Sequence, residues 1–270
     1  MSPETTNKPH ISDSQMRTLA YCGILYSNRY IDGRIIPPGI AAARGLGVHH
    51  AAAKNGKQKI QSGVDLPLAD LRDIAAEAFN TQLDTEGIWL NPEEMSIGPH
   101  KVLGQAKDET VRIAEFYGTR VAPDYQPVKV EETFRVELPG PRDYLGVIDL
   151  IDDQQRVRDF KTAAKSKTQA EADSSIQLTG YAAGHQVLTG LPASDVGLEV
   201  LVTTSTGVSR QTLVSHRDAK DFDVLAARIN AANRVIDAGA FLPADPSHWL
   251  CSAKWCGFHS TCPYAGGRRR

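Results

Sequence analysis

Residues 146–162, GVIDLIDDQQRVRDFKT, constrain the fold more than any other stretch of the chain. Two short runs with the β-branched, alternating character of strands, 144–151 and 156–162, flank a polar break, which predicts a β-hairpin. Charged residues inside a strand require an explanation. Asp159 and Lys161 are two residues apart, so on a strand they share one face. The hairpin therefore carries an acid and a base in one small patch.

Asp149, on the first strand of this hairpin, joins the patch in only some registers. A four-residue loop at 152–155 would pair Asp149 with Arg158 and leave Asp159 on the opposite face, because directly opposed residues share a face. A loop of three or five residues, or a bulge, brings both carboxylates to one face. We predict such a loop or bulge, since metal chemistry needs both carboxylates at one ion. The alternative is an ordinary surface hairpin with scattered charges.

The composition predicts a globular protein with one large domain, or one domain with appended helices. The chain has 270 residues, of which 41% are apolar, enough for a sizeable core. Thirty Lys and Arg against 32 Asp and Glu give a net charge of −2, so any contact with nucleic acid must come from local basic clusters. No apolar run has the character of a signal peptide or a membrane span, which predicts a cytoplasmic location and no membrane partner.

The order of expected elements is typical of a mixed α/β layered fold. We expect a disordered polar tail at 1–10, a single domain at 11–264 and a basic tail at 265–270. Helices are predicted at about 12–26, 40–57, 67–83, 107–122, 168–188 and 218–238, and strands at 126–138, 144–151, 156–162, 198–203 and 208–214.

Two carboxylates and a lysine on one face suit metal-dependent hydrolysis of a phosphodiester. Carboxylate oxygens hold Mg²⁺ or Mn²⁺, and such ions stabilise the attacking and leaving oxygens. Lys161 would orient the water or offset developing negative charge. A third ligand is expected from the helix at 40–57, where His49 is the best candidate and His50 the alternative. Adjacent helical side chains point about 100° apart, so at most one imidazole reaches the site, and either histidine could instead be structural.

Contacts with the DNA backbone could come from the helix that follows the hairpin. Gln177 and Tyr181 lie four residues apart on one helical face, from which an amide and a hydroxyl can reach phosphates, although an ordinary amphipathic helix would look the same. The C-terminal residues 268–270 are all arginine and could also touch DNA, but terminal charge runs are usually just solvated. Local positive charge near the proposed site comes from Arg44, Lys54, Lys57, Lys59, Lys165 and Lys167.

The four cysteines are distributed asymmetrically. Cys22 lies near the start, whereas Cys251, Cys256 and Cys262 fall within twelve residues near the end. In a cytoplasmic chain of this size the pattern favours metal ligation over disulfides. The alternative is four unrelated buried thiols.

Four motifs, in the expected order, resemble the RecB-like branch of the PD-(D/E)XK nuclease superfamily. They are RGLGVH at 44–49, GVID at 146–149, DFKT at 159–162 and QLTGY at 177–181. The resemblance spans nearly the whole chain. It implies a restriction-endonuclease-like α/β core, in which a mixed central sheet is flanked by helices, with helical additions.

The resemblance also implies roles for individual residues. Lys161 looks like the catalytic lysine, acting with Asp149 and Asp159. The metal ligands would be His49, Asp149, Asp159 and the backbone carbonyl of Phe160. The DNA-binding residues would be Gln177 and Tyr181, with Arg44 and Lys165 as neighbouring cations. Glu131 or Glu132 sits where such proteins often carry a glutamate, but the sequence assigns it no role.

The cysteines extend the resemblance to the iron-sulfur nucleases of this branch, of the AddB-like, CRISPR-associated RecB-like and phage exonuclease type. In these proteins one early cysteine joins three late ones around a 4Fe-4S cluster. Many relatives have two residues between the first two late cysteines, whereas four separate Cys251 from Cys256. Tetrahedral thiolate also suits zinc, so a zinc site is the rival. Either would form a clasp between Cys22 and 251–262.

The activity that the resemblance implies is a Mg²⁺- or Mn²⁺-dependent DNA exonuclease. It would act on single-stranded or duplex ends in recombination, repair or DNA-end processing, alongside a recombinase, a helicase or a CRISPR integrase. A second hypothesis is a non-catalytic DNA-end binding or CRISPR-adaptation protein that uses the same fold as a clamp, against which the intact D-x-K argues. An RNA-directed or tRNA-type nuclease comes third, since nothing in the sequence reads bases.

Overall fold

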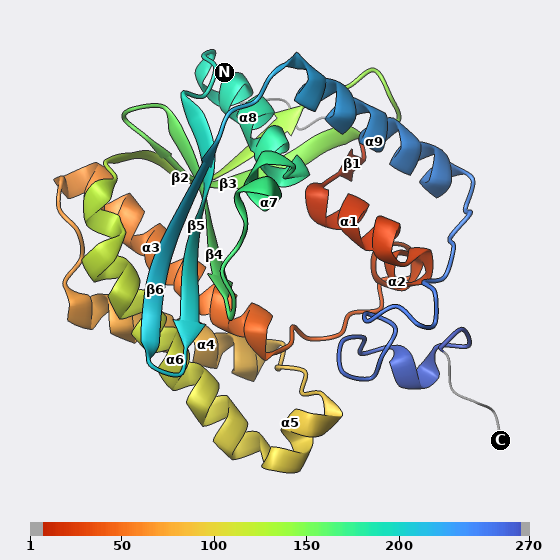
Figure 1. Ribbon diagram of the computed structural model, residues 1–270, viewed down its shortest axis with the longest axis horizontal. Coiled ribbons are helices and arrows are strands. Elements are labelled where there is room, and N and C mark those ends of the chain that lie inside the picture. Colours follow the sequence, from red (N-terminus) through yellow and green to blue (C-terminus); the bar gives the residue numbers. More distant parts are fainter. Residues whose placement is uncertain (1–7, 266–270) are drawn as a thin grey trace.

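A six-stranded mixed sheet lies at the centre of the molecule (Figure 1). The computed structural model describes residues 8–265. Strands β3, β4, β5 and β6 follow one another across the sheet, β2 pairs with the other edge of β3, and β1 extends beside the start of β3. Neighbouring strands are antiparallel except for the parallel pairs β1–β3 and β4–β5. Their bounds are His10–Ile11 (β1), Pro127–Val136 (β2), Asp143–Asp152 (β3), Arg156–Ala163 (β4), Asp195–Thr204 (β5) and Gly207–Ser215 (β6).

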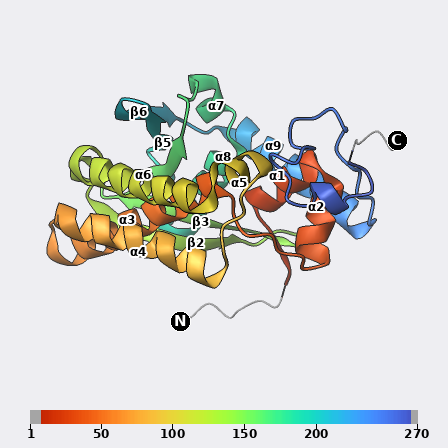
Figure 2. The same ribbon diagram turned by 90° about the horizontal axis from the view of Figure 1, so that it is seen from below.

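Helices cover both faces of the sheet. Three long helices form one layer: α3 (Ile40–Ser62), α4 (Leu68–Thr85) and α6 (Pro99–Arg120). The other face is covered by α8 (Ile176–Thr189), with α9 (Ala219–Asp237) and α1 (Asp13–Tyr21) packed beside it. Figure 2 shows α1, α2 and the C-terminal segment gathered at one end of the molecule. The short elements are α2 (Gly23–Tyr26), η1 (Ser27–Ile31), α5 (Pro92–Ile97), η2 (Ala122–Asp124), α7 (Gln169–Asp173) and η3 (His259–Thr261).

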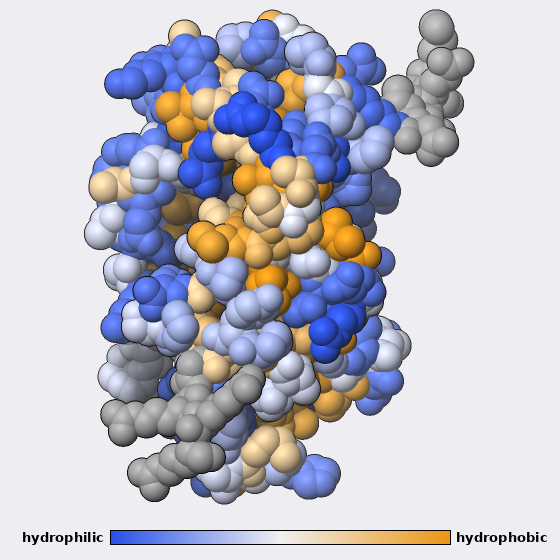
Figure 3. Space-filling view, turned by 90° about the vertical axis from the view of Figure 1, so that its right-hand side faces the viewer, coloured by the Kyte–Doolittle hydropathy of each residue, from blue (hydrophilic) through white to orange (hydrophobic). Residues whose placement is uncertain are grey.

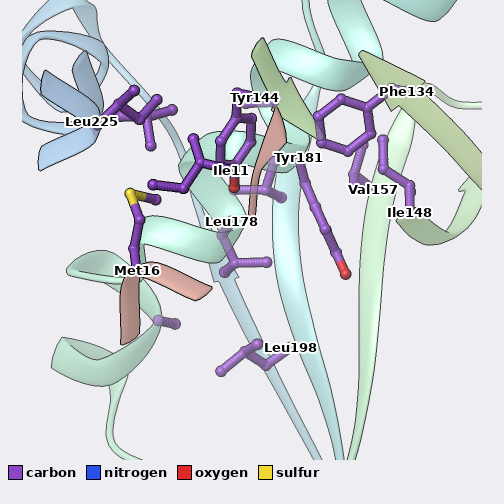
Figure 4. Packing of buried hydrophobic residues seen from close by; sticks show 14 of the residues in the cluster. Ile11, Met16, Phe134, Tyr144, Ile148, Val157, Leu178, Tyr181, Leu198 and Leu225 are labelled. Carbon is purple, nitrogen blue, oxygen red and sulfur yellow. The ribbon is translucent and has the colours of Figure 1, made fainter. Parts of the chain in front are cut away.

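Two apolar cores hold these layers on the sheet. The larger core packs Ile11, Tyr144 and Tyr181 between the sheet and the layer of α8, α9 and α1 (Figure 4). The smaller core packs residues such as Tyr117 and Phe160 between the sheet and the layer of α3 and α6. Because each face of the sheet is buried, the strands carry few free polar positions. Some charged residues inside the sheet form structural ion pairs, such as Asp143 with Lys8 and Arg158 with Asp195.

The larger core reaches the surface at the α1 end, because Met16 and Ala232 belong to it and also line a surface cavity. Figure 3 shows apolar side chains gathered in the middle of the face that carries α1 and α9. A cavity of about 280 Å³ lies there between the two helices, and its lining includes Met16, Leu19, Val235 and Leu242.

The expected α/β layering is confirmed, but several boundaries differ. The helix predicted at 12–26 ends at Tyr21, because Cys22 adopts an extended backbone and caps α2. The helix predicted at 107–122 begins at Pro99 instead, where proline suits the first helical turn. The helix predicted at 168–188 is interrupted between α7 and α8, where the Ser175 side chain caps α8. Helix α5 was not predicted.

Part of the expected disordered tail is structured. Lys8 contacts Asp143 at 2.7 Å, and His10–Ile11 pairs with β3, so residues 8–10 of the expected tail lie against the sheet. The rest of that tail, 1–7, and the arginines at 268–270 lie outside the described residues. No helix in the described part of the chain is both long and apolar enough to cross a membrane.

Candidate active site

The hairpin between β3 and β4 aligns two carboxylates. Its loop has three residues, 153–155, and the pairing of Leu150 with Arg158 sets a register that places Asp149 opposite Asp159. Gln155 has a φ of 61°, the left-handed conformation found at the end of three-residue hairpin loops. The prediction of a three- or five-residue loop or a bulge is confirmed.

Asp149 lies where the two strands separate. Within the described residues, β3 and β4 pair only near the loop, and Oδ2 of Asp149 accepts a hydrogen bond of 2.8 Å from the backbone amide of Phe160. Burial and the neighbouring Asp159 hold the pKa of Asp149 well above its usual range, against the opposing effect of Lys161. A buried acid beside a second acid is an arrangement that a bound cation would stabilise.

Helix α3 brings His49 to this carboxylate. A Cβ at Gly56 would lie 2.6 Å from a methyl of Val130, so glycine permits α3 to approach β2 this closely. Nδ1 of His49 is 3.4 Å from Oδ2 of Asp149. Burial and then Lys161 lower the pKa of His49, which favours the neutral imidazole that metal ions bind.

Glu131 completes a group of three that the sequence did not assemble. In the described part of the chain, one ligand atom each of His49, Glu131 and Asp149 lie within 4.8 Å of one another. The register of β2 and β3 sets Glu131 opposite Asp149. Its φ is 51°, a conformation uncommon for residues with a side chain and often found where function requires strain. The sequence showed two adjacent glutamates inside an alternating strand, but it did not indicate which of them faces the site.

Asp159 pairs with Lys161 and is not a member of that group of three. The lysine Nζ lies 2.9 Å from Oδ1 and 2.8 Å from Oδ2 of Asp159. The lysine side chain is 35% exposed, whereas the Asp159 side chain is 1% exposed. Apart from this ion pair with Lys161, Oδ2 accepts no hydrogen bond of good geometry from the described residues. Both residues lie close enough to act electrostatically on His49 and Asp149.

Gln177 and Tyr181 lie on α8, which covers the face of the sheet opposite α3. The amide of Gln177 donates to the Tyr181 hydroxyl at 2.9 Å. Burial raises the pKa of Tyr181, and Asp149 and Asp159 raise it further, so the hydroxyl lies near both carboxylates. Figure 4 shows the Tyr181 side chain passing beside Phe134 from α8.

The two expected cations have different environments. Arg44, on α3, forms an ion pair with Glu109 of α6, so its guanidinium links two helices. Lys165 is exposed in the loop after β4 and makes no ion pair with any described residue. Of the two, Lys165 is free for a phosphate.

The four cysteines occupy one neighbourhood at the α1 end. Burial raises the pKa of the Cys256 thiol, and Cys22, Cys262 and Cys251 each add to this rise. Sγ of Cys22 accepts backbone hydrogen bonds from Leu25 and Ala244, each 3.4 Å. Among the described residues no three of the four sulfurs lie within 4.8 Å of one another.

Comparison with known proteins identifies a family and solved structures of similar fold. A family model described as the PD-(D/E)XK nuclease superfamily matches residues 10–263. The crystal structure of a provisionally assigned exonuclease from Eubacterium rectale is similar over 88% of this chain and 85% of that chain, with a TM-score of 0.51 and 11% identity. The match to the structure of SSO0001 covers 80% of this chain and 96% of that chain at 15% identity, with a TM-score of 0.32. None of the curated proteins has a significantly similar sequence.

Proposed function

We propose that this chain, which belongs to the PD-(D/E)XK nuclease superfamily, is a metal-dependent exonuclease that hydrolyses DNA from its ends. The observation that carries the proposal is the convergence of His49, Glu131 and Asp149 beside the Asp159–Lys161 pair. One imidazole and two carboxylates form a donor set for Mg²⁺ or Mn²⁺, with the imidazole favouring Mn²⁺.

The residues at the site divide into ligands and a charged partner. His49, Glu131 and Asp149 would hold the ion, and Asp159 and the carbonyl of Phe160 would complete the ligand set. When bound, the ion would polarise the phosphate and lower the pKa of a coordinated water. Lys161, which Asp159 holds at the exposed side, would orient the water or offset the charge that develops on the phosphate.

The side chains around the site would position the DNA. The hydrogen-bonded pair of Gln177 and Tyr181 lies near the carboxylates and would contact the backbone next to the cleaved bond. Lys165 offers an unpaired ammonium in the loop that leaves β4. The chemistry suits recombination, repair or DNA-end processing, in a phage or a cell, with a recombinase, a helicase or a CRISPR integrase as partners. The Asp159–Lys161 pair argues against a non-catalytic clamp.

The test uses purified protein and DNA labelled at either the 5′ or the 3′ end. With Mg²⁺ or Mn²⁺ we expect mononucleotides or short products from linear DNA, no cleavage of closed circular DNA, and complete loss of activity in EDTA. Cleavage of circles would contradict the exonuclease assignment. Binding of ends without cleavage, under every metal tested, would instead support the clamp.

Replacement of Glu131 separates a ligand from an ordinary strand residue. Glu131→Gln should raise the Mg²⁺ concentration needed for half-maximal cleavage by about tenfold or more, because it removes one charged oxygen ligand. Glu132→Gln is the matched control, since Glu132 is the next residue and forms a partly exposed ion pair with Lys129 at 3.6 Å. A metal titration of cleavage measures both variants. Equal effects of the two substitutions would remove Glu131 from the ligand set.

We propose that the four cysteines hold a 4Fe-4S cluster and that zinc is the less suitable occupant. Zinc binds thiolates at about 2.3 Å in a tetrahedron, which brings the sulfurs to within about 4 Å of one another. The electrostatic effect of Cys22, Cys251 and Cys262 on Cys256 supports one group shared by all four. The two backbone hydrogen bonds to Sγ of Cys22 are of the kind that tune iron-sulfur clusters. The cluster would link α2 to the C-terminal segment.

A further inference from the structure

A groove along α3 opens directly onto the ligand group. A cavity of about 260 Å³ is lined by the two ligands His49 and Glu131 and by His50, Lys54 and Lys57. It continues into a larger hollow of about 640 Å³ between α3 and α4, with which it shares His50 and Lys54. The groove is therefore a route from the solvent to the proposed metal ligands.

Two lysines of α3 line this groove. Lys54 and Lys57 are exposed, and neither ammonium makes a hydrogen bond or an ion pair with any residue from 8 to 265. In contrast, Lys59 on the same helix is buried and bonded to Asp65 and to the carbonyl of Ala122. Exposed cations of this kind contribute little to the stability of the fold and are available to attract an anion.

The spacing of these residues matches a nucleic-acid strand. His50, Lys54 and Lys57 are four and three residues apart, so they lie on one face of α3. At a rise of 1.5 Å per residue they extend over about 10 Å. A row of this length is long enough to contact two successive phosphates of one strand.

The opposite wall of the groove has the opposite charge. The α4 side of the larger hollow contributes Glu77 and Glu86. Carboxylates on that wall would repel a second phosphate backbone. The groove thus has room and charge for one strand along α3, whereas a duplex would place its other backbone against the acids.

We propose that His50, Lys54 and Lys57 bind the phosphates of a single DNA strand next to the cleaved bond, and that the enzyme takes single-stranded ends. The inference rests on the proposed nuclease function, because it assigns the strand to the groove that leads to that site. It also adds a substrate class, which the ligand residues alone do not specify. The lysines are positioning residues, and they take no part in the reaction.

The test compares Lys54→Gln/Lys57→Gln with Lys220→Gln, an exposed lysine on α9. On single-stranded DNA the double variant should have a KM about tenfold higher with kcat unchanged. In EDTA, the slope of log K for binding against log salt should become shallower by about 1.4, since each phosphate contact on a single strand contributes about 0.7. The control should behave as the wild type, and the wild type should cleave single-stranded ends at least about tenfold faster than blunt duplexes.

Several outcomes would overturn the inference and leave the nuclease function intact. They are an unchanged KM and salt slope in the double variant, a fall in kcat alone, or a wild-type preference for blunt duplexes. A wild type that cleaves no DNA with any metal would contradict the proposed function instead. In that case the salt slope still tests the groove, because binding in EDTA does not depend on cleavage.

Discussion

Replacing Lys161 with alanine should lower kcat for DNA cleavage by about 10²–10³-fold. Its Nζ is held by the buried carboxylate of Asp159 at the exposed side of the ligand group. Removing a preorganised charge at the reacting centre acts on the transition state, so KM and the metal requirement should change little. The measurement is the initial rate of nucleotide release from end-labelled DNA over a range of DNA and Mg²⁺ concentrations.

Two further variants make this result interpretable. Lys167→Ala is the matched control, because Lys167 lies six residues further along and pairs with exposed Glu171 at 2.7 Å. Lys161→Arg keeps a positive charge beside Asp159, so the protein should fold, but a planar guanidinium does not replace a compact ammonium. Circular dichroism and a thermal melt check that each variant is folded. A folded Lys161→Ala protein that degrades DNA at the wild-type rate would show that the site assignment is wrong.

Asp149→Asn should produce a different defect at the same site. Asp149 contacts His49 and accepts a hydrogen bond from the backbone amide of Phe160, so it is central to the ligand group. Asp149→Asn should raise the Mg²⁺ concentration needed for half-maximal cleavage and also lower kcat. Lys161→Ala should lower kcat alone. The two kinetic patterns distinguish a ligand from a charged partner.

Loss of one cysteine should abolish the cluster and destabilise the protein. Wild-type protein purified without oxygen should be brown, with iron and sulfide in near-equal amounts, and Cys256→Ser should be colourless. Because metal binding is coupled to folding, we expect the Tm to fall by about 10 °C, corresponding to about 3–5 kcal/mol for a chain of this size. Iron, sulfide and zinc analyses together with a thermal melt measure both effects.

The control for this experiment is a serine in the same C-terminal segment. Ser260 is exposed between Cys256 and Cys262, so Ser260→Ala should keep the colour and the Tm. A colourless wild type with one zinc per chain would refute the iron-sulfur assignment and favour the zinc alternative. Brown protein from Cys256→Ser with unchanged stability would show that Cys256 is not a ligand.

Local sequence patterns were sufficient for most of the elements. Alternation predicted β3 and β4, and apolar spacing predicted α4 and most of α6, because the side chains of one helix or strand repeat at its own period. Boundaries failed where a cap or an extended residue interrupts a periodic run. Cys22 ends α1 in this way, and no period in the sequence marks the position.

The sequence predicted most residues of the candidate site, but not the contacts that they make. The common face of Asp159 and Lys161 follows from two-residue spacing alone. The sequence could not show that Arg44 would be paired with Glu109, a partner 65 residues away. Nor could it show that His50 would line the groove while His49 meets Asp149. Contacts of this kind depend on how α3 packs against β2 and α6.

By itself the sequence determined the hairpin, its acid and base on one face, and the order of the motifs around it. The tertiary structure decided the register that sets Asp149 opposite Asp159, and it chose Glu131 over Glu132 as the third member of the group. The reason is physical. Periodicity fixes which side chains share a face within one segment, whereas the meeting of β2, β3 and α3 depends on loop conformation and on packing between distant segments.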